Sequence, residues 1–73
     1  MAEQSNELRK LIEIATDMDL TIDIRGKALE TIGKMGSHES LLALLAVAGN
    51  ESMVRQEREH ALKYAMQIVK SNN

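Results

Sequence analysis

The spacing of apolar residues follows a helical period along most of the chain. Leucine, isoleucine and alanine recur every three or four positions over residues 6–17 and again over 24–35. This spacing places apolar side chains on one face of an α-helix. Residues 37–48 are apolar on every side after their first turn, and a last helical pattern covers 52–70. No segment alternates apolar and polar residues as a strand does, so we expect an all-α fold of four helices.

Residues that favour helix ends separate these patterns. Asp19 or Thr21 can accept a hydrogen bond from the N–H groups that begin the second helix. Gly36 follows the last apolar position of that helix, where glycine commonly ends a helix. Ser37 is suited to cap the third helix, and Gly49 follows its last apolar residue. The turns between the helices are therefore expected to be short.

Length and composition narrow the class of protein. The 73 residues are enough for one domain, 1–73. The chain has no cysteine and a formal net charge of −2, so neither a thiolate metal site nor a general attraction to polyanions is expected. The longest apolar run, 41–48, is too short to span a bilayer. The polar residues at the start contain no hydrophobic signal segment, which favours a cytoplasmic location.

The first half of the chain aligns with the second half at a displacement of 33 residues. Without gaps, residues 8–35 align with residues 41–68, with six identities among 28 pairs. The break after the first predicted helix aligns with the break after the third. We therefore expect one domain of two helical hairpins, about 6–36 and about 37–70, related as repeats. An up-down four-helix bundle is the alternative fold, and in a bundle the 33-residue register would have no structural meaning.

The segment DLTIDIRGKALETIG, residues 19–33, resembles the second helix of a HEAT repeat, in the short form found in phycobilisome-lyase-like proteins. That family has an acidic residue at the turn, an aliphatic–arginine pair, an alanine three residues later and an aliphatic ending that closes on glycine. The matching residues are Asp19, Ile24, Arg25, Ala28, Ile32 and Gly36. The resemblance implies a fold of two stacked HEAT-like hairpins, and it implies no specific activity.

The resemblance also implies a structural role for Arg25. An arginine at this position in the family holds the turn together, so we expect an exposed ion pair between Asp19 and Arg25, worth about 0–1 kcal/mol. The second unit departs from the pattern. Ser52 replaces the acidic residue and Glu57 replaces the aliphatic residue, although Arg58 falls on Arg25 in the 33-residue register.

A glycine pair near the end of the second helix has an alternative interpretation. Gly33 and Gly36 have the spacing of the G-x-x-G loop with which KH domains clamp a nucleic-acid backbone. A KH domain needs strands, and the pattern of this chain offers none. We therefore interpret the segment as a helix end with Gly36 as its stop.

Residues suited to catalysis or metal binding are few. His38-Glu39 resembles the His-Glu pairs with which some HEAT-repeat hydroxylases hold a di-iron centre, but such a centre needs several pairs. At His60 the order is reversed, with Glu59 in front of the histidine. Ser37, like the other serines near helix starts, is suited to capping rather than to nucleophilic catalysis. We expect no enzyme activity, no metal site and no cofactor.

In a HEAT-like arrangement the second helix of each hairpin lines a concave face, and here that face has mixed charge. Mixed charge suits a protein partner better than a polyanion. Tyr64 is the best candidate for an anchor, because tyrosine combines a large contact area with a hydroxyl group; alternatively, it only packs over the hairpin edge. The candidate partner-binding residues are Tyr64, Lys63, Glu59, Gln67, Lys27, Glu30 and Lys34. The sequence thus predicts a non-enzymatic protein-interaction or adaptor module.

Three alternatives are compatible with the same residues. Basic side chains of the second and fourth helices can contact a nucleic-acid backbone, although acidic neighbours dilute their charge; they are Lys27, Lys34, Arg55, Arg58 and Lys63. The apolar third helix is either covered by the other helices or exposed on one side, where it would bind a partner or a second copy. A small molecule between the hairpins is disfavoured, because the aliphatic core has no polar group to orient it.

Overall fold

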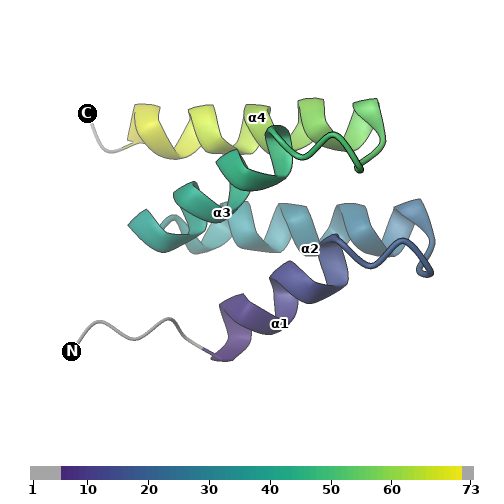
Figure 1. The fold of residues 1–73 in the computed structure, drawn as a ribbon. Helices are drawn as coiled ribbons and strands as arrows, with labels where there is room; N and C mark the ends of the chain where they lie inside the picture. The colour runs from purple at the N-terminus through teal and green to yellow at the C-terminus, as the bar shows by residue number, and fades with distance from the viewer. Residues whose placement is uncertain (1–5, 72–73) are drawn as a thin grey trace.

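The computed structural model describes residues 6–71 and contains four α-helices: α1 (Asn6–Ala15), α2 (Ile22–Met35), α3 (His38–Ala48) and α4 (Arg55–Ser71) (Figure 1). No strand occurs within this range. The predicted all-α fold of four helices is confirmed. The helices bury an aliphatic core, formed by Leu8, Ala15, Ala28, Leu29, Ile32, Ala43, Leu44, Val47, Met53, Ala61, Ala65 and Ile68.

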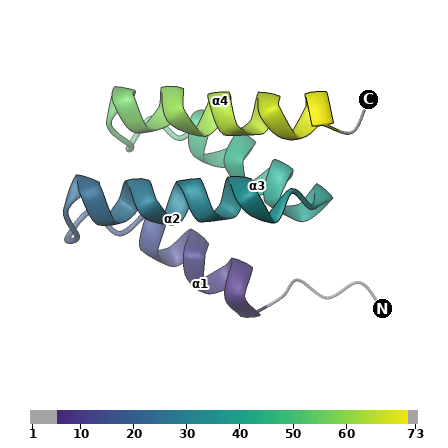
Figure 2. The same ribbon diagram turned by 180° about the vertical axis from the view of Figure 1, so that it is seen from behind.

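Consecutive helices pack as hairpins. α1 packs against α2 and α3 against α4, while α2 also contacts both helices of the second hairpin. In both Figure 1 and Figure 2, α2 and α4 lie side by side and run in the same direction, with α1 and α3 behind them in Figure 2. An up-down bundle places its second and fourth helices on a diagonal. The contact between α2 and α4 therefore separates this packing from that of a simple bundle.

The two turns inside the hairpins have the same hydrogen bonds. In the first, the Leu20 N–H donates to the Asp17 carbonyl at 3.1 Å, and the Asp19 N–H donates to the Asp17 Oδ1 at 2.9 Å. The equivalent bonds 33 residues later join Met53 to the Asn50 carbonyl at 3.0 Å and Ser52 to the Asn50 Oδ1 at 2.9 Å. These side chains imitate a backbone turn, as Asp and Asn commonly do. The 33-residue register is therefore a structural repeat at both turns.

These turns also shorten two predicted helices. The helix predicted over 6–17 ends at Ala15, and the helix predicted from 52 begins at Arg55. In each hairpin the Asp or Asn side chain bonds its own backbone two residues on, and such local bonds compete with helical ones. The predicted length was therefore too long at the end of α1 and at the start of α4.

The ends of α2 and the start of α3 follow the expected chemistry. Thr21 caps α2, its hydroxyl accepting from the Ile24 N–H at 3.3 Å. Gly36 ends α2 with φ of 64°, a left-handed conformation that side chains rarely adopt. Ser37 caps α3 by accepting from the Ser40 N–H at 3.0 Å. The segment around Gly36 is thus a helix end, as interpreted from the sequence.

The apolar third helix is covered on one side only. Ala43, Leu44 and Val47 are buried, whereas Leu42 and Leu45 are exposed. The helix is therefore not enclosed by the other three.

Candidate protein-binding surfaces

A groove follows the line where α2 and α4 pack together. At Gly33 the helices approach closely, because a Cβ added there would lie 3.1 Å from the Cβ of Tyr64. The half-buried Tyr64 lines both hollows along this line. We call this surface the α2–α4 groove and define it by Asp23, Lys27, Glu30, Gly33 and Lys34 on α2 and by Gln56, His60, Tyr64 and Gln67 on α4.

The rim of the α2–α4 groove carries exposed charges of both signs. Asp23, Lys27, Glu30 and Lys34 alternate along α2, and Glu30 pairs with Lys34 at 3.7 Å. This ion pair is exposed and contributes little to stability. The charges therefore remain accessible to a partner. A rim of alternating sign is suited to a partner that also carries both signs.

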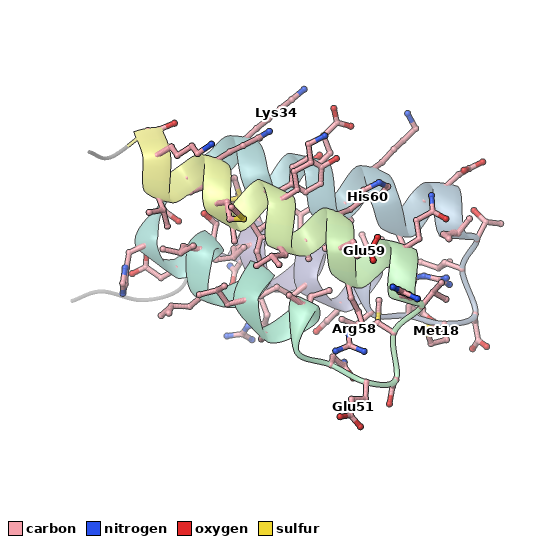
Figure 3. All side chains as sticks on the ribbon, turned by 90° about the horizontal axis from the view of Figure 1, so that it is seen from above. Met18, Lys34, Glu51, Arg58, Glu59 and His60 are labelled. Carbon is pink, nitrogen blue, oxygen red and sulfur yellow. The ribbon has the colours of Figure 1, made fainter. Side chains whose placement is uncertain are left out.

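The anchor expected at Tyr64 has an aromatic neighbour. The rings of His60 and Tyr64 have their centroids 6.4 Å apart and are tilted by 42°. Aromatic rings at this spacing interact favourably in tilted arrangements. His60 therefore belongs to the same surface, on the side of α4 that faces α2 (Figure 3). The sequence carried one signal for this placement, since His60 precedes Tyr64 by one helical turn.

Five of the seven predicted partner-binding residues lie in the α2–α4 groove, and two do not. The five are Lys27, Glu30, Lys34, Tyr64 and Gln67. Lys63 and Glu59 lie instead on the other flank of α4, beside Leu62 and Met66. Lys63 is one residue from Tyr64 and Glu59 is five, which places them about 100° and about 140° around the helix from it, so neither faces the groove with Tyr64. The prediction of one continuous face was therefore wrong for these two residues.

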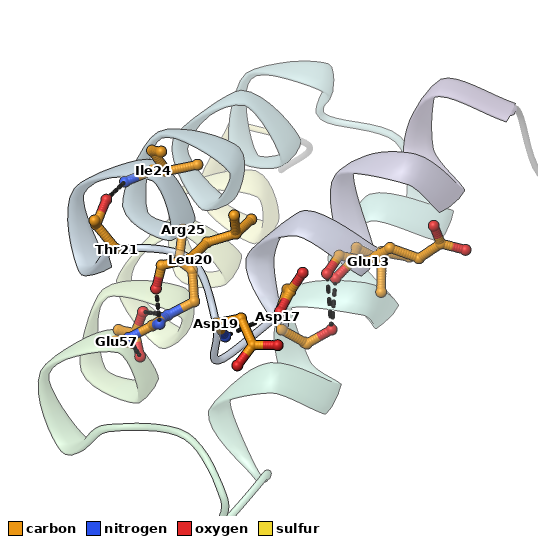
Figure 4. A network of polar contacts seen from close by, with 10 residues as sticks. Glu13, Asp17, Asp19, Leu20, Thr21, Ile24, Arg25 and Glu57 are labelled. Carbon is orange, nitrogen blue, oxygen red and sulfur yellow. Dashed lines mark hydrogen bonds and ion pairs between the residues drawn. The ribbon is translucent and has the colours of Figure 1, made fainter.

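A buried ion pair joins the two hairpins below the groove. The Arg25 Nε donates to the Glu57 Oε2 at 2.6 Å, and the Arg25 Nη2 donates to the Glu57 Oε1 at 3.3 Å (Figure 4). The Arg25 Nη1 donates to the Leu20 carbonyl at 2.6 Å. Both side chains are almost fully buried, with exposures of 6% and 2%. The pair therefore links α2 to α4 through two charge-assisted hydrogen bonds.

The predicted ion pair between Asp19 and Arg25 does not form. Arg25 does hold the turn, through the Leu20 carbonyl, but its carboxylate partner is Glu57. Asp19 is exposed, and its N–H donates to the Asp17 side chain. The sequence did contain a signal for this ion pair, because Glu57 stands where the repeat pattern has an aliphatic residue. A carboxylate at a core position needs a buried partner, and Arg25 supplies it.

Residues suited to metal binding are dispersed in the described part of the chain. No group of three or more His, Cys, Asp or Glu side chains able to hold a metal ion occurs among residues 6–71. His38 lies exposed at the start of α3, while His60 faces the groove. Within the same residues, none of the helices combines the length and apolarity that a membrane crossing requires.

The basic residues of α2 and α4 are divided between two surfaces. Lys27 and Lys34 line the α2–α4 groove, whereas Arg55, Arg58 and Lys63 lie on the other flank of α4. Arg55 pairs with Glu59 at 3.2 Å. The five cations therefore do not form a single stripe along which a nucleic-acid backbone would run.

Comparisons with known proteins give no relative for this chain. No protein-family model, curated protein or solved structure matches it. Function is therefore inferred from the surfaces described above.

Proposed function

We propose that this protein is a non-enzymatic protein-interaction or adaptor module built from two HEAT-like hairpins, and that it acts in the cytoplasm. Its principal binding surface is the α2–α4 groove. The single observation that carries the proposal is the accessible, half-buried Tyr64 at the centre of a groove with charges of both signs on its rim. Interfaces are enriched in tyrosine at their centre and polar residues at their rim.

The burial of the core supports a binding role over a catalytic one. The ionisable side chains that are buried, Arg25 and Glu57, satisfy each other and the Leu20 carbonyl. No buried side-chain nitrogen or oxygen in the described residues is left without a hydrogen-bond partner. A buried polar network that is fully satisfied in this way rigidifies a core. The polar and charged side chains that are free to contact another molecule lie at the surface, where they serve to recognise a partner.

A capture experiment with matched charge variants tests the groove. The wild type, a Lys27→Glu/Lys34→Glu variant and an Arg9→Glu/Lys10→Glu control are immobilised, and lysate of the native host is passed over each with nuclease present. Both variants change two exposed cations to anions, and the control changes them on α1, outside the groove. A protein held by the wild type and the control but lost from the groove variant supports the proposal.

Two other results would contradict it. Equal capture by the groove variant and the wild type would exclude the groove as the binding surface. Capture that disappears when nuclease is added would indicate nucleic acid as the partner, with a steep dependence on salt. Circular dichroism of each variant verifies that its helices are intact.

A further inference from the structure

Repeat-equivalent residues of the two hairpins differ in burial in a systematic way. Leu29 is 0% exposed, while Leu62, 33 residues later, is 46% exposed. The difference is reversed for Met35 and Ile68, which are 39% and 4% exposed. Ile68 lines a hollow together with residues of α2, so it lies on the side of α4 that meets the first hairpin. In the 33-residue register, the side of α4 that carries the exposed Leu62 corresponds to the side of α2 that carries the buried Leu29.

Arg25 and Arg58 occupy equivalent positions in the two hairpins but differ in their partners. Arg25 holds its turn through the Leu20 carbonyl and reaches forward to Glu57 of the next hairpin. Arg58 also holds its turn, its Nε donating to the Ala48 carbonyl at 2.9 Å. No carboxylate among the described residues lies within ion-pair distance of Arg58. Arg58 thus has the turn contact of Arg25 without its carboxylate.

Apolar side chains lie beside Arg58 on the same face. Two adjoining hollows meet at Glu59 and Leu62, and they are lined by Ala48 of α3 and by Met66 of α4. Leu45 precedes Ala48 by one turn and is exposed. We call this surface the open face and define it by Leu45 and Ala48 on α3 and by Arg58, Leu62 and Met66 on α4. Figure 3 places Arg58 on the side of α4 opposite His60, away from the groove.

The charge around the open face is positive. Its cations are Arg55, Arg58, Lys63 and Lys70, and its carboxylate, Glu59, is already paired with Arg55. An acidic occupant is therefore favoured over a basic one. Contiguous apolar residues rimmed by charge are typical of a surface that another element covers.

A second copy of the chain does not supply the missing charge. If a second copy stacked head to tail, it would present Ile24 at the position that Glu57 occupies within the chain. If two open faces met, each would bring the same excess of cations against the other. The first arrangement leaves Arg58 without a carboxylate while its surroundings lose water, and the second sets like charges against each other; both are costly.

We propose that the open face binds an amphipathic helix of a partner protein that carries a carboxylate against Arg58 and apolar residues against Leu62 and Leu45. The required pattern is that of the α4 face which packs on α2: a Glu or Asp at position i and apolar residues at i+4 and i+11, as at Glu57, Ala61 and Ile68. The open face is separate from the α2–α4 groove, so this proposal deepens the assignment as an interaction module without depending on the groove.

The probe is a helix-stabilised peptide with the sequence of residues 52–71 in which its four cations are neutralised by Arg55→Gln, Arg58→Gln, Lys63→Gln and Lys70→Gln. It keeps the required pattern, and Glu57 and Glu59 make it acidic. The full chain is labelled with ¹⁵N and titrated with the peptide. We expect saturable amide shifts at Leu45, Leu62 and Met66. A peptide with Glu57→Lys should bind the wild type about tenfold more weakly or worse, and it should bind an Arg58→Glu chain better than the original peptide does.

Variants of the chain distinguish binding at the open face from binding at other surfaces. Leu62→Asp, at an exposed position, removes binding even if Arg58→Glu proves too unstable to use. The Lys27→Glu/Lys34→Glu groove variant should bind the peptide like the wild type. The test of the open face is therefore independent of the test of the α2–α4 groove. Peptide that exchanges with the chain's own α4 would bind beside Arg25, and it would shift amides throughout α2 and α4 rather than only those of the open face.

Three results would overturn the proposal: no saturable binding, binding that Arg58→Glu and Leu62→Asp leave unchanged, and a wild-type dimer in light scattering that Leu62→Asp converts to monomer. The last would identify a second copy as the occupant. Charge reversal that restores affinity between Arg58→Glu and the Glu57→Lys peptide supports the proposal directly.

Discussion

The two hairpins share their turns but differ in the number of neighbours their helices have. In both hairpins the turn residues Asp17 and Asn50 make the same hydrogen bonds, and an arginine, Arg25 or Arg58, donates to a carbonyl near its own turn. Arg25 also meets a carboxylate, Glu57, because the second hairpin packs beyond the first, whereas no carboxylate among residues 6–71 pairs with Arg58. Equivalent residues in a repeat thus have different energetic roles according to whether the next unit is present.

The largest effect is expected at the two arginines. Arg25→Ala leaves Glu57 buried without its counter-charge and should lower the free energy of unfolding by about 3–5 kcal/mol. Arg58→Ala removes one partly exposed hydrogen bond and should cost about 1 kcal/mol. Urea unfolding followed by circular dichroism measures both. Equal losses of stability in the two variants would contradict the difference between the hairpins. The double variant Arg25→Met/Glu57→Leu replaces the buried ion pair with apolar side chains and should recover most of the stability lost in Arg25→Ala.

A pair of leucines tests the same difference in the apolar core. Leu29→Ala opens a cavity between the hairpins and should cost about 2–5 kcal/mol. Leu62→Ala removes an exposed side chain and should change stability by less than about 0.5 kcal/mol. Both substitutions introduce alanine into a helix, so propensity cancels in the comparison. A similar loss from Leu62→Ala would mean that the open face is already covered in solution.

Two glycines of α2 test how closely the hairpins pack. Gly26 has no atom within 4 Å of an added Cβ, so Gly26→Ala should raise stability by about 0.5–1 kcal/mol through helix propensity. At Gly33 the added Cβ meets the Cβ of Tyr64, which cannot rotate away, so the helices must separate. Gly33→Ala should therefore lower stability by about 1 kcal/mol despite the same gain in propensity. Thermal unfolding of both variants provides the measurement, and stabilisation by Gly33→Ala would argue against tight contact.

The smallest effect is expected at the helix caps, where the hairpins also differ. Thr21 caps α2, whereas the equivalent residue before α4 is Val54, which has no oxygen to accept a hydrogen bond. Val54→Thr should stabilise the fold by about 0.5–1 kcal/mol, and Thr21→Val should cost a similar amount. Their melting temperatures should move in opposite directions. Unchanged stability in Val54→Thr would mean that the start of α4 is satisfied in another way.

Local features of the fold were predictable because they depend on residues close in sequence. The apolar period predicted four helices, Gly36 and Ser37 marked one boundary correctly, and Asp17 and Asn50 gave matching turns. The two helix ends that were misplaced lie at those turns, where side-chain hydrogen bonds compete with helical ones. The groove was predicted in part, since five of its residues follow the helical spacing from Tyr64 and along α2.

The sequence alone determined the helices, their order and the repeated turns, because hydrogen bonds and periodicity within a helix act over a few residues. The tertiary structure decided which repeat-equivalent side chains are buried, such as Leu29 and not Leu62, and gave Arg25 its partner Glu57. It also divided the predicted binding residues between two surfaces. The physical reason is that burial depends on which neighbouring helix covers a face, and one residue along a helix turns a side chain by about 100°.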